Sequence, residues 1–211
     1  MASTAHAYQH VQGIYLPIAV GVFVTVVITL LVLLIRGARR RTPGRHSQAL
    51  VLEAVYAAAL ALVVAFLLWV TFTAETPIDR TAARPGYRIR VIAGQWSWRF
   101  VYPNGVSVAD VSTWHPAPAY VPMGTEVEFV GSSEDVIHGF WVPDLHYQRQ
   151  LVPGYTTRFD LFFPTPGYYG GVCSVLCGED HSEMHFALRA VSHQGFQEWL
   201  TREAARQGVS P

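Results

Sequence analysis

The sequence predicts a two-part protein, an N-terminal transmembrane α-helical hairpin followed by an all-β domain of the β-sandwich or Greek-key barrel type. Two long apolar runs lie in the first third of the chain, and after Pro77 the pattern changes to short β-type runs separated by proline and glycine. The composition agrees, since 51% of the 211 residues are hydrophobic and only 14% are charged, against about 25% in an ordinary soluble domain. Such a composition argues against a disordered chain and against a freely soluble enzyme.

The first apolar run, residues 14–35, contains no charged residue. As a helix it would span about 33 Å, enough to cross a hydrocarbon core of about 30 Å. A signal peptide is disfavoured because the run is too long, no basic residue precedes it and no small-residue cleavage site follows it. A second run of similar length covers residues 50–72 and carries one acid, Glu53, near its start. We therefore expect a membrane hairpin, with a buried helical hairpin of a soluble protein as the alternative.

The charges are distributed unevenly although they sum to zero, with 15 basic residues, all of them Arg, and 15 acids. Five of the Arg lie in residues 36–45, between the two apolar runs. By the positive-inside rule this loop is cytoplasmic, which places both termini and the domain after about residue 76 on the periplasmic or outer side. Residues 75–211 hold 14 acids against 10 Arg. The zero net charge also removes any whole-chain argument for nucleic-acid binding.

Six segments of the outer half are expected to form strands. Some alternate in hydrophobicity, as in RFDLF and EVEFV, and turns such as P-N-G, P-M-G and T-P-G separate them. Several short strands in about 110 residues are typical of a β-sandwich or Greek-key barrel. An amphipathic helix is expected at residues 194–206. The expected strands are residues 87–92, 96–102, 125–130, 155–163, 168–172 and 185–191.

Both cysteines of the chain lie in one loop, CSVLCGEDHSEM, which contains Cys173, Cys177, His181 and Met184. Two thiols, an imidazole and a thioether form a soft donor set, which favours copper over hard cations. Three interpretations remain open: a disulfide in an oxidising compartment, a tetrahedral zinc site with a further His, and two copper ions bridged by the two thiolates. Only the last uses Met184, and it requires a second His and one more weak donor, such as a backbone carbonyl.

A second His is available at His138, in SSEDVIHGFWVP, which we expect at the end of the strand led by EVEFV. A His at the end of one strand and a Cys-rich loop between two later strands can meet at one end of a sandwich. A lone His after a strand is more often structural than a metal ligand. The unfilled ligand position in the cysteine loop nevertheless favours His138 as a ligand.

Two outward-ending helices, GQWSW, SSEDVIHGFWVP and CSVLCGEDHSEM together resemble subunit II of haem–copper oxidases of the cytochrome c oxidase type, over nearly the whole chain. With this resemblance, residues 1–75 are expected to form a two-helix transmembrane anchor and residues 76–211 an outward-facing cupredoxin domain. The resemblance implies a dinuclear copper A centre in that domain. Its implied ligands are His138, Cys173, Cys177, His181 and Met184, together with the backbone carbonyl of Val175.

Three residues near these ligands take roles from the resemblance. Trp96 in GQWSW matches the Trp at which electrons from cytochrome c enter, although Ser97 replaces the family's middle Tyr. The alternative is that Trp96 and Trp98 pack on one face of a strand. Glu134 and Asp135 match acids that attract a basic cytochrome c, in agreement with the negative outer half.

Glu53 falls where the family has the glutamate at the mouth of a proton channel. From position alone, a carboxylate at the membrane interface is the alternative, because an acid within about a turn of the interface is tolerated there. The resemblance therefore favours the proton-channel role for Glu53.

The sequence departs from the family where the subunit faces its catalytic partner. Val175 stands in place of the usual Glu between the two cysteines. The backbone carbonyl survives this change, but the carboxylate for a magnesium ion shared with subunit I does not, which puts the magnesium ion in doubt. Gln148 and Gln150 likewise replace a Lys and an Asp of the family.

The resemblance implies the subunit through which electrons enter a proton-pumping terminal oxidase of the plasma membrane. It would accept electrons from cytochrome c or a similar donor and pass them to a haem in subunit I, where oxygen is reduced to water. The chain would thus belong to an oxidoreductase, cytochrome-c oxidase, whose bond chemistry resides in its partner. The alternatives are the copper A subunit of a related nitric oxide reductase and a membrane-anchored copper chaperone, for which three Met in all are few.

Overall fold

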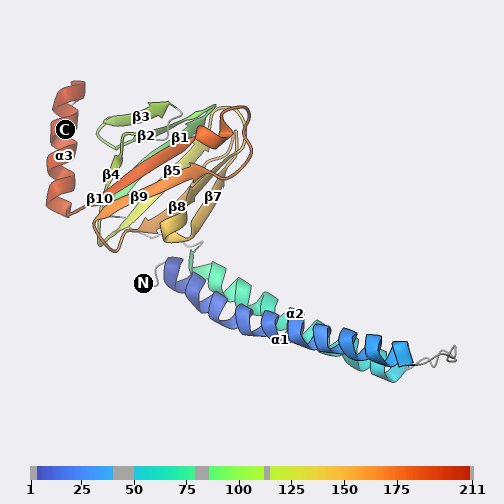
Figure 1. The fold of residues 1–211 in the computed structure, drawn as a ribbon. Helices are drawn as coiled ribbons and strands as arrows, with labels where there is room; N and C mark the ends of the chain where they lie inside the picture. Colours follow the sequence, from blue (N-terminus) through green and yellow to red (C-terminus); the bar gives the residue numbers. More distant parts are fainter. Residues whose placement is uncertain (1–3, 40–49, 79–85, 112–114, 210–211) are drawn as a thin grey trace. The chain divides into compact units, whose positions relative to one another are not determined.

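The computed structural model describes residues 4–39, 50–78, 86–111 and 115–209. The chain divides into a helical unit over residues 7–77 and a β-rich unit formed mainly by residues 78–211 (Figure 1). Each unit has its own internal contacts and is considered by itself.

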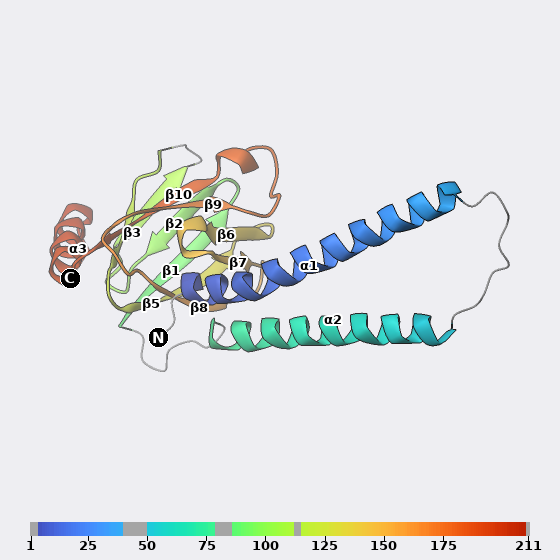
Figure 2. The ribbon, with the colours of Figure 1, turned by 60° about the horizontal axis from the view of Figure 1, so that its bottom comes forward.

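The helical unit consists of two long helices, α1 (Thr4–Arg39) and α2 (Leu50–Ile78) (Figure 2). Both are long and apolar enough to cross a membrane, over His6–Arg36 and Val51–Ala74. A polar contact joins them, because the Tyr15 hydroxyl in α1 donates to the backbone oxygen of Leu67 in α2 at 2.9 Å. The two expected helices are therefore present.

Both helices continue beyond the apolar runs from which they were predicted, because hydrophobicity marks the part of a helix that fits the membrane and not the ends of the helix. Most of the arginine-rich loop that sets the expected orientation, including Arg40, Arg41 and Arg45, lies outside the described residues. The cytoplasmic position of that loop therefore stays a prediction.

The β-rich unit is a sandwich of two five-stranded sheets, as expected (Figure 1). The first sheet has the strand order β3-β2-β1-β5-β8 and the second the order β4-β10-β9-β6-β7. Most neighbours are antiparallel, whereas β1 pairs with β5 and β10 pairs with β4 in parallel. The strands of the first sheet are β1 (Tyr87–Gly94), β2 (Ser97–Val101), β3 (Ser107–Val111), β5 (Glu126–Ser133) and β8 (Thr157–Phe162). Those of the second are β4 (Ala119–Pro122), β6 (His138–Val142), β7 (Tyr147–Leu151), β9 (Gly167–Cys173) and β10 (His185–Val191).

All six expected strands are present, β10 with the expected bounds and the other five with shifted ends. The expected C-terminal helix is α3 (His193–Gln207), capped by the Ser192 hydroxyl. The sequence prediction missed β3, β4, β6 and β7. Three of these, β3, β4 and β7, lie at sheet edges. A short edge strand is held by its pairing partner more than by its own residue pattern, so the sequence carries a weak signal for it.

The core between the sheets is aromatic beneath the end that holds the cysteine loop. Trp98 and Phe186 lie 4.9 Å apart between ring centroids, and Phe140 and Phe186 stack at 4.5 Å. Gly171 of β9 leaves the space for this packing, because a Cβ there would lie 2.0 Å from the Phe186 ring. All three aromatic side chains are almost completely buried. A rigid aromatic layer therefore supports the last residues of β9.

A buried carboxylate links three strands on the other face of the first sheet. Glu128 of β5 is hydrogen-bonded to Arg88 of β1, and its Oε1 accepts from Arg158 of β8 at 3.0 Å. The Glu128 side chain is only 5% exposed, whereas both guanidinium groups are half exposed. Burial alone would raise the pKa of Glu128, but the two arginines outweigh burial and hold the pKa below its ordinary value.

We expect Glu128→Gln to lower the free energy of unfolding of the β-rich unit by about 1–3 kcal/mol, because two guanidinium groups lose their charged acceptor. The folded-state pKa of Glu128 is lowered, so its contribution is complete above the ordinary carboxyl pKa of about 4.3 and is lost as the pH falls through the folded value. Denaturant unfolding of the chain in detergent at about pH 7 and about pH 4 would measure this. The variant should lose less stability between the two pH values than the parent.

The matched control is Glu126→Gln, two residues earlier on the same face of β5. Equal losses in the two variants would contradict the assignment of this stability to the Glu128 cluster.

Candidate metal centre

Strands β6, β9 and β10 are neighbours in one sheet, and their pairing brings the expected donors to one end of the sandwich. In the pair of β6 with β9, Phe140 lies opposite Cys173. His138, two residues before Phe140, therefore lies beside the segment that follows β9. On the other side of β9, the Cys173 N–H donates to the carbonyl of Met184 at 3.0 Å, directly before β10. Residues far apart in the sequence thus meet around the last residue of β9.

His138 was expected at the end of the strand led by EVEFV, and this placement is wrong. That strand, β5, ends at Ser133 in the first sheet, and His138 is the first residue of β6 in the second sheet. The chain crosses between the sheets in the turn 134–137, where the Asp135 carboxylate accepts from the Val136 N–H at 2.6 Å. The crossing is what brings His138 into the same sheet as the cysteine loop.

The first half of the centre is built around Cys173. Its Sγ lies 3.8 Å from Nδ1 of His138, 3.2 Å from the carbonyl oxygen of Val175 and 3.7 Å from Sγ of Cys177. Gly139 allows this approach, because a Cβ on Gly139 would lie 2.2 Å from the Ser174 hydroxyl. The ligand atoms of His138, Cys173 and Cys177 all lie within 4.8 Å of one another.

The second half is built around Cys177. Its Sγ lies 3.6 Å from Nδ1 of His181 and 3.7 Å from Sδ of Met184. A short 3-10 turn, η2 (His181–Glu183), leads from His181 to Met184, and both side chains contact Cys177. The structure therefore gathers all six donors that the resemblance implied.

The centre is shielded from solvent except near His181. His138 is completely buried, Met184 is 1% exposed, and Cys173 and Cys177 are 6% and 4% exposed. His181 is half buried, and the neighbouring Leu176 is 80% exposed. Most of the donors thus lie in a water-poor setting just beneath the surface.

Both cysteines are free thiols in the structure. Their sulfurs are 3.7 Å apart, whereas a disulfide bond joins sulfurs at about 2.05 Å. The structure therefore does not contain the disulfide that the sequence left open.

The two thiols differ in acidity. Burial alone would raise the pKa of Cys173, but hydrogen bonds with His138 and with the Gly139 N–H outweigh burial and lower the pKa. Burial and the negative charge of Cys173 raise the pKa of Cys177. One thiolate therefore opposes the second, and a bound cation is what allows both sulfurs to take the thiolate form that binds metals.

The chemistry of the donor set fits two copper ions better than one zinc ion. A tetrahedral zinc site takes four donors and would leave the thioether of Met184 and the carbonyl of Val175 unused. Two copper ions would use all six donors, namely two thiolates, two imidazoles and two weak donors, the Met184 thioether and the Val175 carbonyl.

Three residues that are not ligands pack against the centre, and two of them were not predicted. The Trp98 indole donates to the Met184 carbonyl at 3.4 Å and lies 6.2 Å from His138 between ring centroids. Gln95 donates through Nε2 to the Cys177 carbonyl at 2.7 Å. Trp96 lies in the turn before β2, where its ring faces the Cα of Gly178. Trp98 could have been found from the alternation of β2, whereas the contact of Gln95 with the Cys177 carbonyl joins residues 82 positions apart.

The two acids beside His138 have partners within the domain. Asp135 Oδ1 accepts from Nε2 of His138 at 2.8 Å, and Glu134 forms an ion pair with Arg99. Burial alone would raise the pKa of Asp135, but hydrogen bonds from His138 and from two backbone N–H groups outweigh burial and lower the pKa. Glu134 remains more exposed than Asp135, with 58% against 31% of the side chain accessible.

Three further residues singled out in the sequence, Glu53, Gln148 and Gln150, are exposed and are not among the six donors. Glu53 is an exposed residue of α2 in the helical unit. Gln148 and Gln150 are exposed residues of β7.

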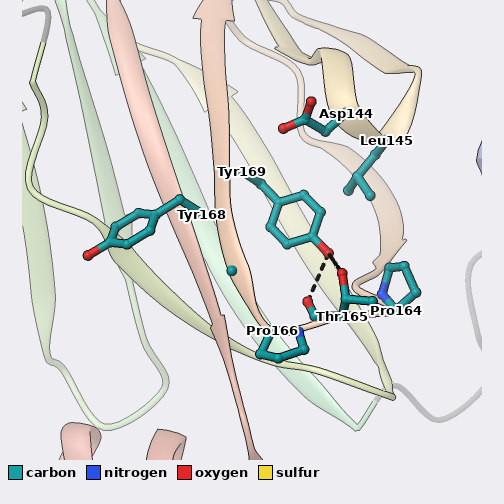
Figure 3. Close-up of a pocket in the computed structure, with 8 residues that line it drawn as sticks. Asp144, Leu145, Pro164, Thr165, Pro166, Tyr168 and Tyr169 are labelled. Carbon is teal, nitrogen blue, oxygen red and sulfur yellow. Dashed lines mark hydrogen bonds between the residues drawn. The ribbon is translucent and has the colours of Figure 1, made fainter.

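The β-rich unit also has a hollow of about 360 Å³, which contains none of the six donors. It is lined by Asp144, Pro164, Tyr168 and Tyr169 among others, and the Tyr169 hydroxyl donates to the Thr165 carbonyl at 2.9 Å (Figure 3). Its lining contains no cysteine and no histidine, in contrast to the cysteine loop.

Comparison with known proteins agrees with this geometry. Residues 115–191 match the family described as "Cytochrome C oxidase subunit II, periplasmic domain". The probable cytochrome c oxidase subunit 2 of Streptomyces avermitilis is 29% identical over 195 residues, which cover 74% of this chain and 61% of the relative. Cytochrome c oxidase subunit 2 of Kluyveromyces lactis is 28% identical over 181 residues, which cover 75% of this chain and 71% of the relative.

The fold has a counterpart among solved structures. The periplasmic domain of subunit II of cytochrome oxidase (CoxB) of Bradyrhizobium japonicum superposes with a TM-score of 0.57 at 23% identity, covering 60% of this chain and 99% of that one. This likeness supports the cupredoxin-like fold. The chain spans 61% and 64% of the lengths of its Streptomyces avermitilis and Streptomyces coelicolor relatives. The chain thus matches the subunit II family over residues 115–191, and over about three quarters of its length it is similar to proteins named cytochrome c oxidase subunit 2.

Proposed function

We propose that this chain is the subunit through which electrons enter a terminal haem–copper oxidase. It would take electrons from cytochrome c or a similar donor at a dinuclear copper A centre and pass them to a haem in subunit I, where oxygen is reduced to water. The observation that carries the proposal is the pair of buried thiols, Cys173 and Cys177, with an imidazole and a weak donor beside each.

When bound by Cys173, Cys177, His138, His181, Met184 and the Val175 carbonyl, copper would supply one-electron redox chemistry at this site. The chain contributes to this by holding its donors in place before any electron arrives. His138 and Cys173 are fixed by the pairing of β6 with β9, and Met184 by its backbone hydrogen bond to Cys173. Burial of these side chains keeps water, and the reorganisation of water, away from the donors.

The helical unit serves as the membrane anchor of the proposed subunit. We assign residues 1–75 to a two-helix anchor and residues 76–211 to the outward-facing cupredoxin domain. The arginine-rich loop supports a cytoplasmic position for residues 36–45, so both termini would lie on the periplasmic side of the plasma membrane. Subunit I and further oxidase subunits would surround α1 and α2, whose apolar side chains are largely exposed.

Trp96 and the neighbouring acids form the proposed contact region for the donor. Trp96 lies against Gly178, the residue after Cys177, and so is close to the centre without being part of it. Glu134, whose side chain is more than half exposed, retains the better position to attract a basic donor. Glu53 keeps its proposed role at the mouth of a proton channel, on the basis of the resemblance alone.

A second candidate function rests on Val175. Its backbone carbonyl oxygen lies 3.2 Å from Sγ of Cys173. Its side chain offers no carboxylate for a magnesium ion at the interface with subunit I. A copper A subunit of a related nitric oxide reductase would not need that carboxylate. A copper chaperone is less favoured, because a protein that hands copper on needs accessible ligands and four of the donors here are buried.

The first prediction concerns the copper centre itself. The purified chain should bind about two copper ions and give an EPR signal in which one unpaired electron couples to two copper nuclei. Cys177→Ser should abolish the shared signal, because one bridge is lost. Ser174→Ala, in the same loop, should leave the signal unchanged. One copper per chain, or the visible spectrum of a mononuclear blue copper site, would overturn the proposal.

The second prediction separates the two indole side chains of WSW. Trp96→Phe should slow electron transfer from a reduced cytochrome c several-fold and leave the EPR signal of the centre unchanged. Trp98→Phe should change the signal, because Trp98 contacts Met184 and His138. Stopped-flow oxidation of the cytochrome and EPR of the same samples would measure both. A normal transfer rate in Trp96→Phe would remove Trp96 from the electron path.

The third prediction distinguishes the two acceptors. The intact complex, isolated through a tag on this chain, should consume oxygen with reduced cytochrome c as donor. Respirometry with oxygen and with nitric oxide on the same preparation would test this. Consumption of nitric oxide without oxygen consumption would establish the second function in place of the first.

A further inference from the structure

Gln95 connects the two ligand-bearing segments of the centre. It lies in the two-residue turn between β1 and β2, which belong to the first sheet, whereas the ligands are attached to the second sheet. Its backbone N–H donates to Oδ2 of Asp135 at 2.6 Å, and its side-chain Nε2 donates to the Cys177 carbonyl at 2.7 Å. Gln95, which is not one of the six donors, thus forms hydrogen bonds with segments from both halves of the site.

The first arm of this connection reaches His138 through Asp135. The second oxygen of Asp135 accepts from Nε2 of His138 at 2.8 Å, which leaves Nδ1 directed at Cys173, 3.8 Å away. A carboxylate on the far nitrogen of a metal-binding His fixes the tautomer and the orientation of the ring. The segment itself is held to β1, because the Glu134 N–H donates to the Ala93 carbonyl at 2.9 Å.

The second arm holds the loop that carries Cys177. Gly178 follows Cys177 with φ at +129°, a conformation that favours glycine. A Cβ on Gly178 would lie 2.9 Å from Nε2 of Gln95 and 3.0 Å from the Trp96 ring. The cysteine loop therefore rests directly on residues 95 and 96, and this contact leaves no space for a side chain.

We propose that Gln95 is a positioning residue that couples the His138 half of the centre to the Cys177 half. The hydrogen bonds from its main chain and its side chain hold the two segments at a fixed separation, so that the donors keep their places when the charge of the centre changes. This inference rests on the proposed copper function. The two hydrogen bonds of Gln95 themselves join protein atoms only.

The test uses the full chain in detergent and the variant Gln95→Met, which keeps the length of the side chain and removes the donor. Gln148→Met, at an exposed position of β7, is the matched control. In the metal-free chain, alkylation of Cys177 by iodoacetamide, followed by mass spectrometry, should be about tenfold faster in Gln95→Met, because one hydrogen bond no longer holds the loop. The thermal unfolding midpoint should equal that of the control. Equal alkylation rates in the two variants would overturn the proposal.

The copper-loaded chain gives a second readout. Gln95→Met should still bind two copper ions, but with unequal coupling of the electron to the two nuclei in EPR and about tenfold faster loss of copper to a chelator. Gln95→Glu, which keeps the shape of the side chain and turns a carboxylate oxygen towards the Cys177 carbonyl, should behave in the same way. If Gln95→Glu matches the parent in both readouts, Gln95 acts through packing and the proposal is wrong.

Coupling between the two arms is tested by Asp135→Asn. If the arms act together, the double variant with Gln95→Met should accelerate Cys177 alkylation by less than the product of the two single effects. If the double variant accelerates Cys177 alkylation by the full product of the two single effects, the two arms are independent and the proposed coupling is wrong. A parent chain that binds no pair of copper ions would refute the proposed function, whereas the alkylation measurements would still decide the role of Gln95.

Discussion

β9 is hydrogen-bonded to β6 on one side and to β10 on the other, and this double pairing places the donors of the centre. Cys173 ends β9, His138 begins β6 and Met184 directly precedes β10. Three donors from distant parts of the chain therefore meet at the same end of neighbouring strands in the second sheet. The loop that leaves β9 must return to β10 next to it, which brings Cys177 and His181 back over Cys173. A shift of one residue in either register would turn His138 or Cys173 to the other face of the sheet.

The same arrangement explains how the donors are held close together. Phe140 and Phe186 stack beneath the centre, and Trp98 packs against both. Gly171 leaves room for the Phe186 ring, and Gly139 leaves room for Ser174. Protein interiors of this density resist small displacements. The two sulfurs are thus held at a separation at which two negative charges oppose each other, and a cationic ligand relieves that opposition. Affinity for a metal and rigidity of the site have a common origin in the packing of the second sheet.

Sequence reasoning could predict the helices, the sandwich and the cysteine loop, because each leaves a local signature in length, alternation or spacing. It misplaced His138, since nothing local shows that the chain changes sheets between Ser133 and His138. It missed β6 because four of the five residues of HGFWV are buried, so the strand lacks the alternation of a half-buried strand. The partners of Glu134 and Gln95 are also beyond sequence reasoning, because Arg99 and Cys177 lie 35 and 82 residues away.

The turn between β5 and β6, residues 134–137, both supports the His138 ring and contributes to the surface beside the centre. Asp135 turns inward to the His138 ring and to Gln95, so most of its charge is used within the domain. The same turn leaves the Glu134 side chain 58% exposed. It also exposes two aliphatic residues, Val136 at 38% and Ile137 at 41%, and Leu176 of the cysteine loop is more exposed still. The surface beside the centre therefore combines the exposed carboxylate of Glu134 with apolar side chains.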